Sequence, residues 1–150
     1  MKSRITHKNT PQLFLKAREN LMLHFRPILS QFQLTDQQWR ILRALDEYGQ
    51  LEPRELCEEC QILSPSMAGV LMRMEKARLI KRESIPGDQR RILVKIANKG
   101  DQLIDKIAPL IDLQYKNIEK AIGKDVLQNL TQSLEKFLSY DVHLIEPVNI

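Results

Sequence analysis

The sequence predicts a mainly α fold of the α+β class, in which helices surround one short β-hairpin. Three observations support this prediction. Apolar residues recur at helical spacing on both sides of the hairpin. Two β-prone runs, residues 80–84 and 92–96, flank the turn-forming sequence Pro86-Gly87-Asp88. Capping residues and prolines divide the chain before the hairpin into several short helices rather than one long helix.

Length and composition fit one globular domain over residues 1–150. The 150 residues are 43% hydrophobic and 28% charged, which is enough apolar material for one sizeable core. No stretch approaches the roughly 18 apolar residues of a membrane span, and the first residues do not resemble a signal peptide. Two cysteines provide no disulfide framework. We therefore expect a cytoplasmic protein that has no membrane partner.

Charge is distributed unevenly along the chain. The net charge of +4 is too modest to indicate a nucleic-acid partner by itself. Residues 73–91, however, hold seven Lys or Arg against three acids, while residues 46–59 hold six acids against one Arg. An asymmetry of this kind orients a protein on a polyanion.

The first helix is expected over about residues 10–33. Thr10 followed by Pro11 is typical of a cap and a first helical residue, and apolar residues then follow at roughly helical spacing. Pro27 lies inside this pattern, so we expect a kink at Pro27 or a break just before it.

Three shorter helices are expected next. Thr35 and Gln38 form a capping box for a second helix that ends before Gly49, and Pro53 can open a third. A fourth helix is expected to begin at residues 64–66 and to run to about residue 77. Its inner side is expected to carry three apolar residues at i, i+4 and i+7, namely Met67, Leu71 and Met74.

Two long helices are expected after Ala97, together over about residues 98–144. The second has apolar residues at a 3-4-3 spacing, Leu127, Leu130, Leu134 and Phe137. A long apolar face on a terminal helix generally needs a partner to cover it, which favours a homodimer. The alternative is packing within one chain.

The fourth helix and the hairpin together suit double-stranded DNA. The helix fits the major groove, and the hairpin reaches the adjacent minor groove. We expect the DNA contacts to come from the outer side of the helix and from the hairpin tip: Ser64, Pro65, Ser66, Gly69, Val70, Arg73, Asp88, Arg90 and Arg91. Asp88 is expected to pair with Arg90 or Arg73. The alternatives are an ordinary amphipathic helix and a hairpin whose charges only solubilise it.

The chain resembles the MarR-type regulators over nearly its whole length. The resemblance is carried by short segments along the chain: Leu34-Thr35, residues 38–42, residues 63–66, Met74-Glu75-Lys76 before Leu79-Ile80, and Asp88-Gln89-Arg90 with Val94 and Ile96. Residues 17–19, 25–28 and 37–41 make it most similar to repressors of homoprotocatechuate or hydroxyphenylacetate catabolic operons. One departure is Ala97, which stands where the family usually has a capping Thr; Asn98 is the alternative cap.

The resemblance implies a winged helix-turn-helix over about residues 35–97 and dimerisation helices over about 10–33 and 98–144. It also implies a homodimeric repressor of an aromatic-compound degradation operon. Such a repressor binds a pseudo-palindromic operator and leaves it when a small aromatic acid enters a cleft beside the dimerisation helices. Groups suited to that ligand are Arg18, His24, Arg26, Trp39 and Arg40. The alternative is that Trp39 belongs to the core and that the arginines are solvated.

A redox-sensing regulator that uses Cys57 and Cys60 is the alternative function. The two thiols match C-x-x-C, but no second ligand pair follows, and neighbouring glutamates are expected to raise their pKa, so we interpret both as core residues. The three histidines are scattered along the chain. We expect no catalytic residues, no metal and no cofactor, and therefore no enzyme.

Overall fold

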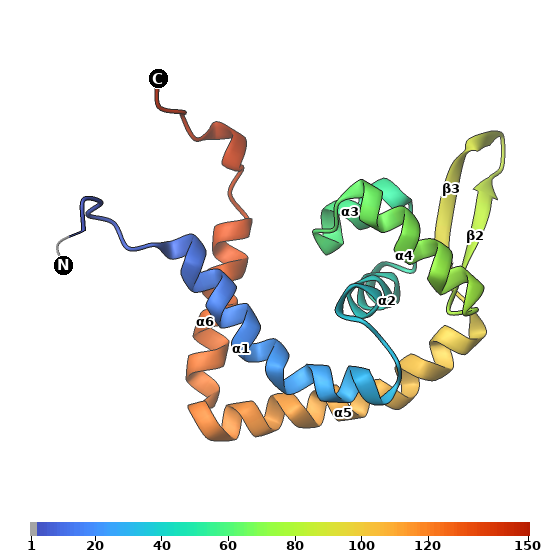
Figure 1. Ribbon diagram of the computed structural model, residues 1–150, viewed down its shortest axis with the longest axis horizontal. Coiled ribbons are helices and arrows are strands. Elements are labelled where there is room, and N and C mark those ends of the chain that lie inside the picture. The colour runs from blue at the N-terminus through green and yellow to red at the C-terminus, as the bar shows by residue number, and fades with distance from the viewer. Residues whose placement is uncertain (1–2) are drawn as a thin grey trace. The chain divides into compact units, whose positions relative to one another are not determined.

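The computed structural model describes residues 3–150 (Figure 1). The predicted fold of helices around a hairpin is confirmed. The elements in order are α1 (Thr10–Gln31), α2 (Asp36–Tyr48), β1 (Gln50–Leu51), α3 (Pro53–Cys60), α4 (Ser64–Lys76), β2 (Ile80–Ile85), β3 (Asp88–Ile96), α5 (Asn98–Ile122), α6 (Lys124–Leu138) and the short 3-10 helix η1 (Val142–Leu144). Residues 1 and 2, which the predicted domain 1–150 includes, lie outside the described residues.

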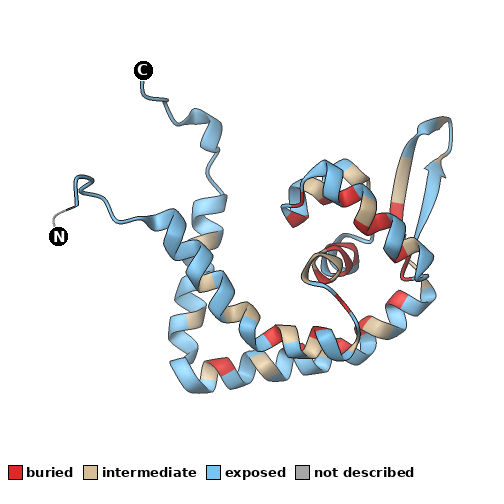
Figure 2. Ribbon diagram, viewed as in Figure 1, coloured by how far each residue is buried: buried red, intermediate tan, exposed pale blue. Residues whose placement is uncertain are grey.

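The chain divides into two compact units, one ending at Ile111 and the other covering residues 112–150. The first unit holds α1 to α4, the sheet and the first part of α5, and it contains the main core. Figure 2 shows buried stretches along α2 and α4. Fully buried side chains of this unit include Leu29, Ile41, Leu42, Leu45, Leu56, Met67, Leu71, Met74, Ile80, Val94 and Ile107.

Local hydrogen bonds explain where the helices begin. The Thr35 hydroxyl accepts from the Gln38 N–H at 3.2 Å, and the Thr35 N–H donates to the Gln38 side chain at 3.0 Å, so the predicted capping box is confirmed. The predicted cap at Thr10 is one residue off. Asn9 is the cap, because its side chain accepts from the Gln12 N–H at 3.3 Å, whereas Thr10 is already helical.

Helix α1 continues through Pro27 to Gln31, so the alternative of a break just before Pro27 is wrong. Phe25 and Leu29 lie on either side of the proline and are 5% and 1% exposed. Their burial anchors the last turns of the helix, before and after the proline, to the core, which offsets the backbone hydrogen bond that proline cannot make.

The sheet contains a strand that the sequence did not predict. Its order is β1-β3-β2, all antiparallel, and Gln50 and Leu51 of β1 pair with Lys95 and Val94. Strand β3 starts at Asp88, earlier than expected, because its pairing with β2 extends to Ile85 beyond a β-bulge. The hairpin turn uses Gly87 with a φ of +87°, a conformation that favours glycine.

Helix α6 in the second unit has no buried residue among those the structure describes. Leu130 and Phe137 of its predicted apolar face are 37% and 54% exposed, and Leu127 and Leu134 are half-buried. The predicted amphipathic helix is therefore present, and in the single chain its apolar side is largely exposed to solvent.

Gly100 allows α5 to pack against the base of the hairpin. A Cβ at this position would lie 2.2 Å from the carbonyl oxygen of Leu79 and 2.8 Å from Cγ2 of Ile96. The same carbonyl accepts from the Ala97 N–H at 2.9 Å, so the backbone cannot easily move away. Only glycine fits this contact.

We predict that Gly100→Ala destabilises the protein by about 1–3 kcal/mol because the added methyl overpacks this contact. Gly to Ala inside a helix normally stabilises by roughly 0.5–1 kcal/mol, so the expected sign is opposite to the helix-propensity effect. Urea unfolding at one fixed protein concentration measures the change, with Lys99→Ala at the exposed neighbouring position as the control. A Gly100→Ala variant at least as stable as the wild type would contradict this account.

Candidate nucleic-acid interface

Helix α4 buries one broad side in the core. Met67, Val70, Leu71 and Met74 are each no more than 2% exposed. The prediction that Val70 lies on the outer side and contacts DNA is therefore wrong. Positions i, i+3, i+4 and i+7 form one continuous face of a helix. The sequence prediction assigned only Met67, Leu71 and Met74 to the buried face, and Val70 fills its i+3 position.

The opposite side of α4 faces solvent. Pro65, Met72 and Lys76 are exposed and Gly69 is half-buried, and these four residues follow i, i+4, i+7 and i+11 along the helix. Ser64, Ser66 and Arg73 are exposed beside this row, as predicted. The sequence prediction missed Ala68, Met72 and Lys76, although continuing the helical spacing around the axis places all three outside.

Arg73 lies across Gly69 rather than against the hairpin. A Cβ built on Gly69 would sit 3.2 Å from Nη1 of Arg73, so the guanidinium occupies the space that glycine leaves open. Arg73 has no salt-bridge partner within residues 3–150, and its expected pairing with Asp88 does not occur. Its charge stays on the outer side of α4.

Two arginine–carboxylate pairs attach the hairpin to the helices. Nε and Nη2 of Arg82 in β2 donate to Glu75 of α4 at 3.2 and 3.1 Å, and this hydrogen bonding lowers the pKa of Glu75. Arg91 in β3 donates through Nε and Nη2 to one carboxylate oxygen of Glu52, the residue before α3. Arg91 was predicted to contact DNA, but the structure gives its guanidinium a partner inside the chain.

Arg90 and Arg91 differ in whether their guanidinium groups have a partner within residues 3–150. The Asp88 carboxylate accepts from the backbone N–H of Arg90 at 3.0 Å, so Asp88 contacts Arg90 through its backbone and forms no ion pair with the Arg90 side chain. This short-range bond fixes the chain as it enters β3. The Arg90 side chain is exposed and forms no ion pair with any residue that the structure describes. Four basic residues between 73 and 91 share this property: Arg73, Lys76, Arg78 and Arg90.

Two of the predicted ligand-binding residues are engaged in an ion-pair network. Nη2 of Arg18 lies 3.3 Å from Oδ2 of Asp36, and Arg26 pairs with both carboxylate oxygens of Glu19 at 2.8 and 2.9 Å. The hydrogen bond from Arg26 lowers the pKa of Glu19. The network joins α1 to the first residue of α2. His24 is exposed on α1.

The other two predicted ligand residues lie between α2 and α3. Trp39 is 8% exposed, and Nη1 of Arg40 donates to the carbonyl oxygens of Cys60 at 2.6 Å and Gln61 at 3.2 Å. Arg40 therefore holds the end of α3 and the turn that leads into α4, where Gln61 has a φ of 52°. Trp39 and Arg40 also border a hollow of about 250 Å³ with Arg43, which the sequence prediction missed although it lies one turn beyond Trp39.

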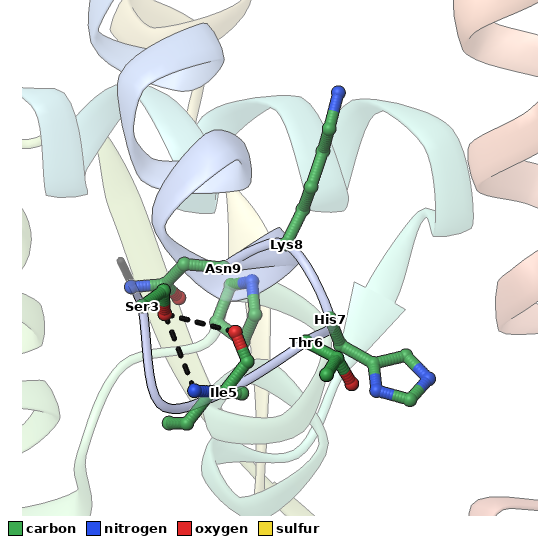
Figure 3. A pocket seen from close by; sticks show the side chains of 7 residues that line it. Ser3, Ile5, Thr6, His7, Lys8 and Asn9 are labelled. Carbon is green, nitrogen blue, oxygen red and sulfur yellow. Dashed lines mark hydrogen bonds between the residues drawn. The ribbon is translucent and has the colours of Figure 1, made fainter. Parts of the chain in front are cut away.

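A larger hollow of about 620 Å³ lies at the amino-terminal segment (Figure 3). It is lined by Ser3, Ile5, Thr6, His7, Lys8, Asn9 and Pro11. Figure 3 shows the Ser3 hydroxyl donating to the Ile5 carbonyl at 2.8 Å, a local turn without a convergent charged group. Residues 3–150 contain no group of three or more side chains suited to hold a metal ion.

The two cysteines lie on α3. Cys60 is 4% exposed, and burial raises the pKa of its thiol to about 11, with Arg40 as the largest opposing influence. A thiol with this pKa is protonated at neutral pH and is a poor nucleophile, so a redox role is not favoured. None of the described helices is long and apolar enough to cross a membrane.

Helices α3 and α4 are short and are followed by a basic hairpin, which two salt bridges attach to the helical part. This arrangement defines a winged helix-turn-helix protein. We call residues 80–96 the wing. The MarR family model matches residues 32–91. The chain is 42% identical to the HTH-type transcriptional regulator FarR of Neisseria gonorrhoeae over 81% of this chain and 86% of that protein. It is 35% identical to the homoprotocatechuate degradative operon repressor of Escherichia coli over 89% of this chain and 90% of that protein.

A solved structure agrees with these sequence matches. The crystal structure of NadR in complex with 4-hydroxyphenylacetate has 38% identity and a TM-score of 0.83, and the match covers 94% of this chain and 100% of that chain. The chain belongs to the MarR family of transcriptional regulators. The family resemblance and the winged helix-turn-helix expected from the sequence are thus confirmed.

Proposed function

We propose that the chain is a transcriptional repressor that acts in the cytoplasm as a homodimer on a palindromic operator. In this proposal α4 enters the major groove and the wing enters the neighbouring minor groove. The observation that carries it is the contrast between Arg90 and Arg91, two of the three arginines of the wing. Glu52 neutralises Arg91, whereas Arg90 is held by its backbone and keeps its charge exposed. A free guanidinium at a hairpin tip suits the narrow, electronegative minor groove.

The surface of α4 supports the same proposal. Ser64, Pro65 and Ser66 form its exposed amino end, where backbone N–H groups attract a phosphate. Arg73 and Lys76 add two charges that no carboxylate neutralises in the described part of the chain. The acidic residues Asp46, Glu58 and Glu59 are exposed elsewhere and repel the DNA backbone, which fixes the orientation of the protein.

A second copy of the chain is the partner that fits α6. This helix has an apolar side and no buried residue, and water is a poor environment for that surface. Pairing by two-fold symmetry covers the same side on both copies and presents two α4 helices. Half-sites are then expected about 34–36 Å apart, one turn of DNA. Regulation of this kind needs binding only, without catalysis, a metal or a cofactor.

We predict that Arg90→Ala weakens operator binding by about 1–3 kcal/mol and reduces the slope of log affinity against log salt by about one unit per wing. The loss follows from removing the one wing arginine that forms no ion pair within residues 3–150. Fluorescence anisotropy with the DNA upstream of the gene for this chain, titrated at several salt concentrations, measures both effects.

Lys106→Ala is the matched control, because it removes one exposed positive charge from α5, outside α4 and the wing. The control should retain the wild-type affinity. Equal affinity of Arg90→Ala and Lys106→Ala would show that the wing does not contact DNA, and absence of salt-dependent binding by the wild type would reject the DNA-binding function itself.

We also propose that a small aromatic carboxylate of the hydroxyphenylacetate class releases the protein from DNA. The support is similarity to the homoprotocatechuate repressor and to NadR bound to 4-hydroxyphenylacetate. Trp39 offers an aromatic wall, and Arg43 beside it is an exposed cation with no salt-bridge partner within the described residues. The carboxylate of an aromatic acid binds most strongly to a cationic side chain, and Arg43 can provide one.

Arg40 connects the proposed ligand region to the DNA-reading helix. It neighbours Trp39 and holds the carbonyls of Cys60 and Gln61, which precede α4. A ligand that draws Arg40 away releases these carbonyls and shifts the start of α4. Arg18 and Arg26 contribute only if the ligand competes with Asp36 and Glu19 for their guanidinium groups. His24 remains a proposed contact from the exposed side of α1.

We predict that 4-hydroxyphenylacetate changes the fluorescence of Trp39, the single tryptophan of the chain, and lowers operator affinity over the same concentration range. The neutral analogue 4-hydroxyphenylethanol should act at least tenfold more weakly, because a hydrogen bond to a charged group contributes roughly 1.5–3 kcal/mol. Arg43→Ala should remove this preference for the acid. Equal effects of acid and alcohol on the wild type would overturn the carboxylate assignment.

A further inference from the structure

Met72 is the one large apolar side chain on the outer side of α4. Its side chain is 59% exposed, whereas the other two methionines of the helix, Met67 and Met74, are 2% and 0% exposed. It stands in the outward row between Gly69 and Lys76. Single exposed apolar side chains are common on protein surfaces, so the position of Met72 carries the argument: it stands in the middle of the outer row of the helix proposed to read DNA.

The surroundings of Met72 favour DNA as that partner. Ala68, four positions before Met72, carries only a methyl group, and the Arg73 guanidinium lies across Gly69, three positions before it, so Met72 projects from a surface of small and cationic groups. Arg73 and Lys76 lie on the same side without carboxylate partners among the described residues. Their charge attracts a polyanion and disfavours an apolar or basic protein partner.

Major-groove chemistry then selects one base. The only apolar group on a base edge in that groove is the C5 methyl of thymine; every other edge feature is a hydrogen-bond donor or acceptor. The flexible, polarizable thioether of methionine adapts its shape to such a small target. We propose that Met72 is a specificity-determining residue that packs on the C5 methyl of one thymine in each operator half-site. This inference rests on the proposed DNA-binding function.

The test uses the full chain and two steps. Binding sites are first selected from a random duplex library with the wild type and with Met72→Ala. In the selected wild-type site each thymine of one half-site is then replaced singly by deoxyuridine, which removes only the methyl group. Affinity is measured by anisotropy for each duplex, and unfolding midpoints confirm that the exposed substitution leaves the fold unchanged.

The wild type should enrich a thymine at one position of the half-site and lose about fourfold in affinity when uracil replaces it, the effect of about one buried methyl group. Met72→Ala should lose the enrichment and bind both duplexes equally. Met72→Leu, which keeps an apolar side chain, should retain the uracil penalty. The matched control is Leu63→Ala, which removes another exposed apolar side chain, 79% exposed, from the turn before α4, and it should also retain the penalty.

Two results overturn the inference while leaving the proposed function intact: tight operator binding with no uracil penalty at any position, or a penalty that Met72→Ala retains unchanged. Failure of the wild type to select any duplex or to bind DNA in a salt-dependent manner rejects the proposed function, and the role of Met72 with it.

Discussion

The rest of the structure depends on the burial of Met67, Val70, Leu71 and Met74 on one side of α4. Fully burying a side chain of this size stabilises a protein by roughly 1.5–3 kcal/mol, so four of them fix the rotation of the helix about its axis. Once that rotation is fixed, the 3.6-residue period determines which residues face outward. The outward row from Pro65 to Lys76 is therefore a consequence of core packing, and the capacity to read DNA follows from it.

The wing is oriented by charge pairs that contribute little to stability. Exposed ion pairs are typically worth 0–1 kcal/mol, so Arg82–Glu75 and Arg91–Glu52 are more important for placing the hairpin relative to α3 and α4. They also neutralise two of the wing arginines and leave Arg90 as the charged group at the tip. The basic segment 73–91, which also holds three acids, thus separates into arginines that hold the wing and basic residues that form no ion pair within residues 3–150: Arg73, Lys76, Arg78 and Arg90.

Sequence patterns predicted the elements that local rules determine. The capping box at Thr35, the start of α4 at Ser64 and the turn at Gly87 all depend on neighbours within a few residues. Long-range contacts account for most of the errors. Strand β1 has only two residues, too few to show an alternating pattern in the sequence. The partners of Arg91 and Arg18, Glu52 and Asp36, are distant in sequence. Arg26 pairs with Glu19, two helical turns earlier in α1, and helical spacing alone does not predict that pair. Val70 was misplaced for a different reason, because the buried face of α4 is broader than the stripe that three residues suggested.

Affinity cleavage tests most directly the claim that two copies of α4 and the wing read one operator. Gln89→Cys at the exposed wing tip, in a Cys57→Ser, Cys60→Ala background, carries an iron–EDTA group that cuts nearby DNA. The account predicts two cleavage clusters related by the dyad of the operator, each with the strand offset of a minor groove. A single cluster, a major-groove offset or absence of cleavage on a duplex that the protein binds tightly would contradict it.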